Sequence, residues 1–396
     1  MDIPQGYKQT ELGIIPDDWE VKRISDFTSI ITGGTPSTLR PEYWGGNIMW
    51  MSSGELNKKF VFDVEGRITT EGLLNSSTHM IPPFCVLIGL AGQGKTRGTA
   101  AYNYISLCTN QSIAAILPND KYDSLYLYYV VDSKYDYLRL LSSGDGGRGG
   151  LNKNLLNSLE IVFPKTIAEQ RAIAEALSDR DGLIAALDKK IAKKRLIKQG
   201  AMQQLLTGKK RLPGFTDSWV EKKLGEILDY EQPQPYLVVS TDYVDSGIPV
   251  LTAGKSRILG YTTEQFGIYN KLPVIIFDDF TTDSKYISYP FKVKSSAMKV
   301  LSLKNNDYDL RLVYELMQQI DFPLKDHQRY WISEYSQLTI SIPKDREEQT
   351  AIATILTDMD KEIADLEAKR DKYSLLKSGM MQKLLTGQIR LKINRI

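Results

Sequence analysis

The sequence contains few of the residues that form metal sites and disulfide frameworks. Cys85 and Cys108 are the only cysteines among 396 residues. Two cysteines are too few for a disulfide framework, so a reduced, cytoplasmic setting is expected. With only two histidines, His79 and His327, a zinc cluster is not supported. We therefore expect no metal site in this chain.

Long apolar segments and an excess of one charge are also missing. Apolar runs such as 274–277 are far shorter than a membrane span, and the first residues have no basic-then-apolar signal region. A soluble protein without a membrane partner is therefore expected. The formal net charge is +2, which indicates that any surface for nucleic acid is local.

The most informative feature that is present is an internal repeat. The segment 164–212 returns without a gap as 343–391, with about half of its positions identical at a constant offset of 179. Each copy follows a globular segment of similar size. The sequence therefore predicts a pseudo-symmetric molecule with a first domain (1–163), a first helical spacer (164–212), a second domain (213–342) and a second helical spacer (343–396).

Each repeated segment carries a heptad pattern of apolar residues. Such a seam predicts a partner helix, and the other copy is the economical partner, in an antiparallel coiled coil. The alternative is that each helix packs on its own domain, but a 39-residue helix of about 58 Å is too long for one small domain to cover. Gly208 and Gly387 are predicted C-caps, and Lys198 and Lys377 interrupt the two seams at the same place. The predicted seam comprises Ile173, Leu177, Ile184 and Leu187 in the first copy, and Ile352, Leu356, Ile363 and Leu366 in the second.

Both globular segments have the pattern of an α+β domain. Strand-like runs at 82–90, 111–117 and 273–280 are short, apolar and bounded by turn residues, while 122–142 and 309–320 have the pattern of helices. The entries to the two domains match, because an aspartate precedes a tryptophan by two residues at Trp19 and at Trp219. After these entries the two sequences diverge.

This arrangement resembles the specificity (S) subunit of type I restriction–modification systems. The resemblance rests on a Glu-Gln-x-x-Ile-Ala start and a Gln-x-Leu-Leu-Thr-Gly end in each helix, at 169–174 and 203–208 and again at 348–353 and 382–387. The stretches GGTPST and GLAGQGKTRGTAAYN in the first domain, and VIIFDDFTTDSKY and HQRYWISEYS in the second, look like two kinds of target-recognition domain. The resemblance covers essentially the whole chain.

The resemblance implies a DNA-binding subunit without catalytic residues. Each domain would read one half of an asymmetric, bipartite target in double-stranded DNA, and the helices would set the spacing and dock two modification (methyltransferase) subunits. Restriction subunits would join that complex. The cofactors S-adenosylmethionine, ATP and Mg²⁺ would be bound by the partner subunits and none by this chain. An antiparallel helix pair would also bring the C-terminus near the entry of the first domain and close a pseudo-circle.

Candidates for DNA contact are cations and polar residues near glycine-rich or aromatic segments. Arginine and lysine neutralise phosphates, and arginine bonds to guanine through two hydrogen bonds. The candidates are Gln93, Lys95, Arg97, Arg148 and Lys153 in the first domain, and Lys255, Arg257, Lys285, Arg329 and Tyr330 in the second.

Some motifs suggest other activities. Gly89–Thr96 fits the Walker A pattern, which leaves a P-loop-like nucleotide hydrolase as an alternative, but a true P-loop runs into a helix and the residues that follow are typical of a strand. A coiled-coil adaptor that does not bind DNA is a second alternative.

Three further motifs have simpler interpretations. The tetrapeptide 81–84 begins with Ile81 instead of the polar residue of an amino-methyltransferase motif, so a strand start is preferred. The nuclease-like letters within 16–22 are too crowded for a metal site and are interpreted as a structural entry segment. The basic run 189–198 is interpreted as a solvated face, a DNA backbone contact or a docking surface.

Overall fold

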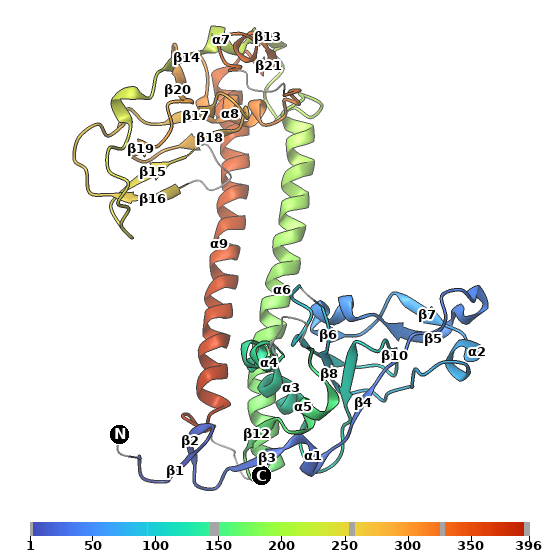
Figure 1. Cartoon of the computed structure of the whole chain (residues 1–396). Coiled ribbons are helices and arrows are strands. Elements are labelled where there is room, and N and C mark those ends of the chain that lie inside the picture. Colours follow the sequence, from blue (N-terminus) through green and yellow to red (C-terminus); the bar gives the residue numbers. More distant parts are fainter. Residues whose placement is uncertain (1–2, 93, 143–149, 253–257, 325–328, 392–396) are drawn as a thin grey trace. The chain divides into compact units, whose positions relative to one another are not determined.

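The computed structural model describes residues 3–92, 94–142, 150–252, 258–324 and 329–391. It divides into two compact units, one of residues 1–188 with 369–396 and one of residues 189–368 (Figure 1). Each unit contains one globular domain and parts of both long helices, α6 (Ile167–Leu205) and α9 (Arg346–Leu384). The predicted α+β class with a long helix after each domain is confirmed.

The globular domain of the first unit has two sheets of three or more strands. Its main sheet has the strand order β4-β11-β8-β9-β6, in which β11 is antiparallel to both β4 and β8, and β8 is antiparallel to β9. A smaller sheet has the order β10-β5-β7, with β10 parallel to β5. The strands are β4 (Ile30–Thr32), β5 (Trp44–Met51), β6 (Phe60–Val61), β7 (Gly66–Ile68), β8 (Val86–Gly89), β9 (Ala100–Asn103), β10 (Cys108–Thr109) and β11 (Ile113–Ile116).

The second unit repeats most of this topology with a different sequence, but among its described residues it has no counterpart of β6, which is parallel to β9 at the edge of the first main sheet. Its main sheet has the order β14-β20-β17-β18, all antiparallel, and its smaller sheet has the order β16-β15-β19, with β15 parallel to β19. The divergence of the two sequences therefore lies in side chains and loops and leaves the central sheets alike. The strands are β14 (Leu228–Glu231), β15 (Ile248–Leu251), β16 (Ile258–Thr262), β17 (Val274–Asp278), β18 (Ser284–Ile287), β19 (Lys292–Val293) and β20 (Met298–Leu303).

Short helices complete both domains. The segment 122–142, predicted as one helix, forms two, because the chain turns at Lys134 between α3 and α4. Among the described residues, no helix combines the length and the apolar composition needed to cross a membrane. The short helices are α1 (Ile24–Phe27), α2 (Thr70–Leu74), α3 (Ser124–Ser133), α4 (Tyr135–Leu141), α5 (Lys153–Asn157), α7 (Leu224–Ile227) and α8 (Leu310–Met317).

The entry strand of each domain pairs with the strand that leads into its long helix. In the first unit β3 (Glu20–Arg23) is antiparallel to β12 (Glu160–Phe163), and in the second β13 (Trp219–Lys223) is antiparallel to β21 (Thr339–Pro343). The start of each domain is thereby fixed next to the start of the helix that follows it. The repeated tryptophans lie at these entries, where Trp19 is fully buried.

The predicted seam positions differ in where they pack. Ile173 and Leu177 belong to the core of the first domain, together with Leu384 and Leu385 from the end of α9. The second unit repeats this, because Ile352 and Leu356 share a core with Leu205 and Leu206 from the end of α6. These seam positions thus contact the domain as well as the opposite helix. Of the other four, Ile363 is buried and Ile184, Leu187 and Leu366 are half-buried.

Candidate nucleic-acid interface and helix anchors

A bidentate ion pair fixes the end of one long helix to the start of the other within each unit. In the second unit, Arg211 donates from Nε and Nη2 to the two carboxylate oxygens of Glu348, at 2.7 Å each. In the first unit, Arg390 donates to Glu169 at 2.8 and 2.7 Å. The hydrogen bonds that Arg390 donates to Glu169 raise the pKa of its guanidinium. The glutamate of each Glu-Gln motif is therefore an anchor for the opposite helix end.

The lysines that interrupt the seams are paired with acids on the opposite helix. Lys377 Nζ lies 2.6 Å from Asp181 Oδ1 in the first unit, and Lys198 Nζ lies 2.6 Å from Asp360 Oδ1 in the second. Because Lys377 is 179 residues after Lys198 and Asp360 is 179 residues after Asp181, the two contacts are copies of each other. A polar pair inside an apolar seam fixes the register of two helices, and both copies run antiparallel.

The glutamine of each Glu-Gln motif connects the long helix to its domain. Gln170 accepts from the backbone N–H of Asp123 at 2.8 Å and donates to the carbonyl of Pro164. Gln349 makes the same two contacts, with the N–H of Asp309 at 2.8 Å and the carbonyl of Pro343. Asp123 and Asp309 are in turn the N-caps of α3 and α8. The repeated motif is thus a structural joint.

The end of α9 packs against the N-terminal hairpin of the first unit, which consists of β1 (Tyr7–Thr10) and β2 (Gly13–Pro16). The Tyr7 hydroxyl donates to the carbonyl of Gly387 at 3.0 Å, and Arg390 also pairs with Asp18 at 2.9 Å. The predicted approach of the C-terminal segment to the entry of the first domain is therefore confirmed within this unit.

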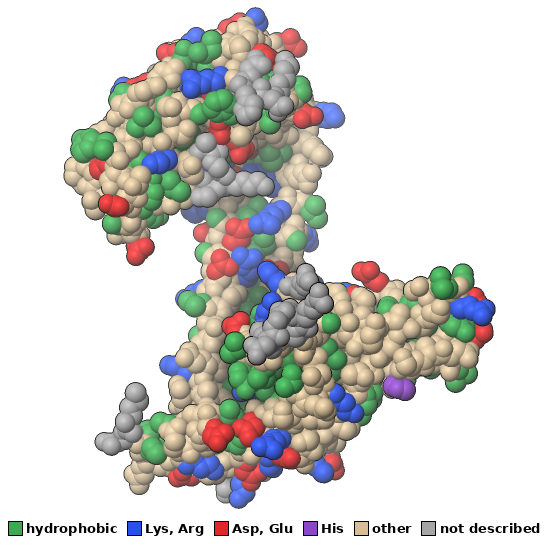
Figure 2. Space-filling view, viewed as in Figure 1, with side chains coloured by type: hydrophobic (Ala, Val, Ile, Leu, Met, Phe, Trp, Pro, Cys, Tyr) green, Lys and Arg blue, Asp and Glu red, His purple; other side chains and the backbone are tan. Residues whose placement is uncertain are grey.

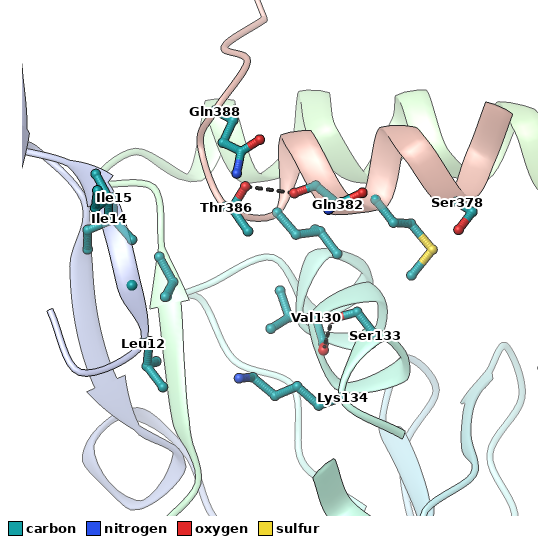
Figure 3. Close-up of a pocket in the computed structure, with 14 residues that line it drawn as sticks. Leu12, Ile14, Ile15, Val130, Ser133, Lys134, Ser378, Gln382, Thr386 and Gln388 are labelled. Carbon is teal, nitrogen blue, oxygen red and sulfur yellow. Dashed lines mark hydrogen bonds between the residues drawn. The ribbon is translucent and has the colours of Figure 1, made fainter. Parts of the chain in front are cut away.

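A pocket of about 580 Å³ lies at this junction (Figure 3). Leu12, Ile14 and Ile15 enter it from the hairpin, Val130 from α3, and Gln382 from α9. Most of these side chains are apolar.

The predicted C-cap glycines lie in the turns that end the long helices. Gly387 adopts a left-handed conformation with φ +71°, and Gly208 does so with φ +66° in the second unit.

Part of the basic run on α6 is neutralised by α9. Lys194 pairs with Glu362 at 2.7 Å, Arg195 pairs with Glu367, and Lys198 pairs with Asp360. These three cations contribute to helix pairing, which reduces the charge that the run presents to a phosphate backbone.

The Walker-like segment is a hairpin loop. It connects β8 to the antiparallel strand β9, so no helix begins after Thr96. Arg139 on α4 donates to the carbonyl of Gly94 at 2.7 Å, and the Tyr135 hydroxyl donates to that of Lys95 at 3.2 Å. A P-loop instead presents backbone N–H groups to phosphate at a helix N-terminus. This geometry removes the structural basis for the P-loop alternative.

The described DNA-contact candidates of the first domain lie at or beside this loop. Lys95 is exposed, Arg97 is half-buried, and Lys153 is exposed at the start of α5. The backbone N–H of Leu151 donates to the carbonyl of Leu90 at 3.1 Å, which brings the segment before Lys153 against the hairpin. Gln93 and Arg148 lie outside the described residues, as do Lys255 and Arg257 of the second domain.

Two candidates of the second domain have other roles. Tyr330 is wrong as a DNA contact, because it is fully buried in the domain core with Phe322 and Trp331. Lys285 is half-buried in β18 and donates to the carbonyl of Thr252 at 3.1 Å. Arg329 is exposed, and its guanidinium lies 5.8 Å from the centre of the Phe280 ring.

The remaining motifs have structural explanations. In the nuclease-like segment, Asp18 pairs with Arg390 and Glu20 pairs with Lys22 at 2.6 Å, which agrees with a structural entry segment. In the tetrapeptide 81–84, Ile81 is buried and forms a bridge with Leu107. Among the residues that the model describes, no group of three His, Cys, Asp or Glu side chains is arranged to hold a metal ion.

Sequence reasoning missed the anchor residues, although the repeat contained the signal. The pairs Glu169–Arg390 and Asp181–Lys377 each join two residues that are identical in both copies of the repeat. A charged residue retained at equivalent heptad positions indicates a partner on the opposite helix. Surface charge carries less information, because cations and anions are interspersed on the face shown in Figure 2.

The comparison with protein families agrees with the repeat. The family model with the description "Type I restriction modification DNA specificity domain" matches residues 16–194 and again residues 216–373, which together make up most of the chain. The two matches begin near the repeated tryptophans.

Individual relatives are similar over different lengths. The chain is 51% identical over 148 residues to the type I restriction enzyme EcoR124I/EcoR124II specificity subunit of Escherichia coli, a match that covers 36% of each chain and therefore about a third of that relative. It is 24% identical to the MjaVIII specificity subunit of Methanocaldococcus jannaschii, over 96% of this chain and 94% of the relative.

A solved structure shows the same fold. The S subunit of a type I restriction–modification system from M. genitalium superposes with a TM-score of 0.69 and 16% identity, covering 100% of this chain and 99% of that one.

Proposed function

We propose that this chain, which belongs to the type I restriction–modification DNA specificity family, directs a methyltransferase complex to one bipartite DNA sequence. Each globular domain reads one half-site, and the two long helices set the distance between the half-sites. The chain itself carries no catalytic residues. Modification subunits bind S-adenosylmethionine, restriction subunits supply ATP- and Mg²⁺-dependent cleavage, and the complex works in the cytoplasm.

One observation carries this proposal: the repeat preserves the helix anchors and changes the loops. The Arg–Glu and Lys–Asp pairs recur at an offset of 179, so both units have the same joints. Four strands of the main sheet also recur in the same order, but the hairpin loop after β8 differs in sequence and contacts from the one after β17. A scaffold with two unlike reading surfaces fits an asymmetric target with a fixed spacer.

The direct test is a methylation assay on the assembled complex. We expect the purified chain alone to leave DNA unmethylated, and the chain mixed with its modification subunit and S-adenosylmethionine to methylate adenines in one bipartite sequence. Sequencing of the methylated bases gives both half-sites and the spacer. Methylation by the isolated chain, or methylation by the complex without a bipartite sequence preference, would contradict the proposal.

The two modification subunits are proposed to dock on an apolar pair that recurs on the helices. Leu196 and Ile197 on α6 are 68% and 46% exposed, and their counterparts Leu375 and Leu376 on α9 are 77% and 47% exposed. Exposed apolar side chains at equivalent positions of both copies match two copies of one partner. Leu183 is also exposed on α6, but its counterpart is Glu362, so it serves as a control.

Replacing these leucines is expected to change the stoichiometry of the complex. Each substitution should weaken binding at its own site roughly tenfold or more. Leu196→Glu and Leu375→Glu should therefore each retain one modification subunit per chain, bound at the unchanged site, and the double variant should retain none. Native mass spectrometry measures the masses directly. Leu183→Glu should retain two subunits. Two bound subunits in the double variant would rule out this docking surface.

A further inference from the structure

The loop between β17 and β18 presents an aromatic ring from a rigid turn. These two strands are adjacent in the main sheet of the second unit (Figure 1). The N–H of Asp278 donates to the carbonyl of Asp283 at 2.8 Å, and Thr282 has a left-handed φ of +57°. Phe280 lies in this loop with 43% of its surface exposed. A large apolar side chain is thus held in solvent by a turn with fixed backbone geometry.

Asp279, the residue before Phe280, joins the loop to a second segment of the chain. Its Oδ1 accepts from the backbone N–H of Tyr330 at 3.1 Å and of Trp331 at 2.7 Å. Lys299 Nζ lies 3.4 Å from its Oδ2, and both side chains are almost fully buried. Tyr330 and its neighbour Arg329 are therefore fixed next to Phe280 by a buried carboxylate and its counterion.

Arg329 is the residue that this joint places beside the ring. Its guanidinium lies over Phe280, and its side chain is exposed. An aromatic face orients a guanidinium by a cation–π contact and leaves the N–H groups along the edge available for hydrogen bonds. Phe280 and Arg329 thus present an exposed apolar ring and an exposed cation side by side, and this pair is called the Phe280–Arg329 fork below.

The corresponding loop of the first domain is built differently. The β8–β9 loop has no aromatic residue, and the arginine beside it, Arg139, donates to the carbonyl of Gly94. The phosphate backbone is the same in both half-sites. A loop that contacts only phosphates would therefore be expected to carry similar side chains in both domains. A feature confined to one domain fits the part of DNA that differs between half-sites, namely the base edges.

Resting on the proposed function, we infer that the Phe280–Arg329 fork reads base edges in the half-site of the second domain. Arg329 would donate two hydrogen bonds to a guanine, and Phe280 would contact a neighbouring apolar edge such as a thymine methyl group. Asp279 and Lys299 act as positioning residues, because they fix the two segments that carry the fork.

The test uses the assembled complex after the wild-type target has been mapped. Arg329→Ala is expected to lower the methylation rate on that target roughly tenfold or more and to relax the preference at one position of one half-site. Phe280→Ala should relax an adjacent position. The half-site read by the first domain should be unchanged. Lys271→Ala removes another exposed cation of the second domain and should leave all preferences unchanged.

Arg329→Lys separates base readout from phosphate contact. A lysine retains the charge but lacks the planar guanidinium that donates two parallel hydrogen bonds and stacks on Phe280, so we expect it to relax the same position, though less than Arg329→Ala does. Recovery of wild-type preference by Arg329→Lys, or unaltered preferences in Arg329→Ala, would overturn the inference. A wild-type complex without a bipartite preference would instead overturn the proposed function, so the two failures are distinguishable.

Discussion

Four residues added to each long helix, after Leu187 in α6 and after Leu366 in α9, are expected to lengthen the preferred spacer by about two base pairs. Four helical residues add about 6 Å at 1.5 Å per residue, and a base pair of DNA occupies about 3.4 Å. The two half-sites should stay the same, because no residue of either domain changes. Methylation of the original target should fall at least roughly tenfold in favour of the longer one.

The two insertion points are chosen from the anchors. Leu187 lies between Asp181 and Lys198 on α6, and Leu366, its counterpart 179 residues later, lies between Asp360 and Lys377 on α9. Matched insertions therefore leave the Asp181–Lys377 and Lys198–Asp360 pairs intact, whereas they separate the exposed pairs Arg195–Glu367 and Asp188–Arg370. A four-residue insertion is a stutter, which a helix pair accommodates by local unwinding.

The measurement is a methylation assay on DNA fragments that differ only in spacer length. Four residues inserted in α6 alone provide the control. They lengthen α6 but not α9, so the anchors of the two units can no longer form at the same time on both helices. This variant should lose stability and activity on every spacer. An unchanged spacer preference in the doubly extended chain would show that the helices do not set the distance.

The long helices could be predicted from the sequence because each is specified locally. Ile173 and Ile352 begin a heptad pattern that continues for roughly five heptads, and Gly208 and Gly387 follow its end. The duplication also identified which segments are scaffold, and the identity of the anchors in both copies was a signal that the heptad pattern alone did not use. Even the approach of the end of α9 to the first domain followed from the antiparallel arrangement.

The contacts inside the domains were not predictable in the same way. Tyr330 is of a residue type that contacts DNA, and it stands next to an arginine in the sequence. In the structure, Asp279, fifty-one positions earlier, accepts from the backbone N–H of Tyr330, and the Tyr330 ring is buried. The common strand order of the two domains was also hidden, because different apolar residues fill equivalent strands. Long-range pairings of this kind depend on the whole fold, whereas helix periodicity depends on neighbouring residues.

Lys299→Met is expected to destabilise the second unit by about 3–5 kcal/mol, because removing one member of a buried ion pair leaves the other charge uncompensated. Lys299 is 1% exposed, and its Nζ lies 3.4 Å from Asp279 and donates to Gln232 at 3.0 Å. Methionine retains most of the side-chain volume, so the loss is one of charge and hydrogen bonding. In thermal unfolding this corresponds to a decrease of about 10 °C for a unit of this size.

The double variant Lys299→Met with Asp279→Asn isolates the buried charge as the cause. Asparagine keeps an oxygen that accepts from the N–H groups of Tyr330 and Trp331, but it carries no charge that requires a partner. Most of the lost stability should therefore return, while Asp279→Asn alone should be destabilised because it leaves Lys299 unpaired. Lys294→Met, at an exposed position of the same domain, should change stability by less than about 0.5 kcal/mol. Equal stability of Lys299→Met and the wild-type chain would mean that the ion pair does not hold the Arg329 segment in place.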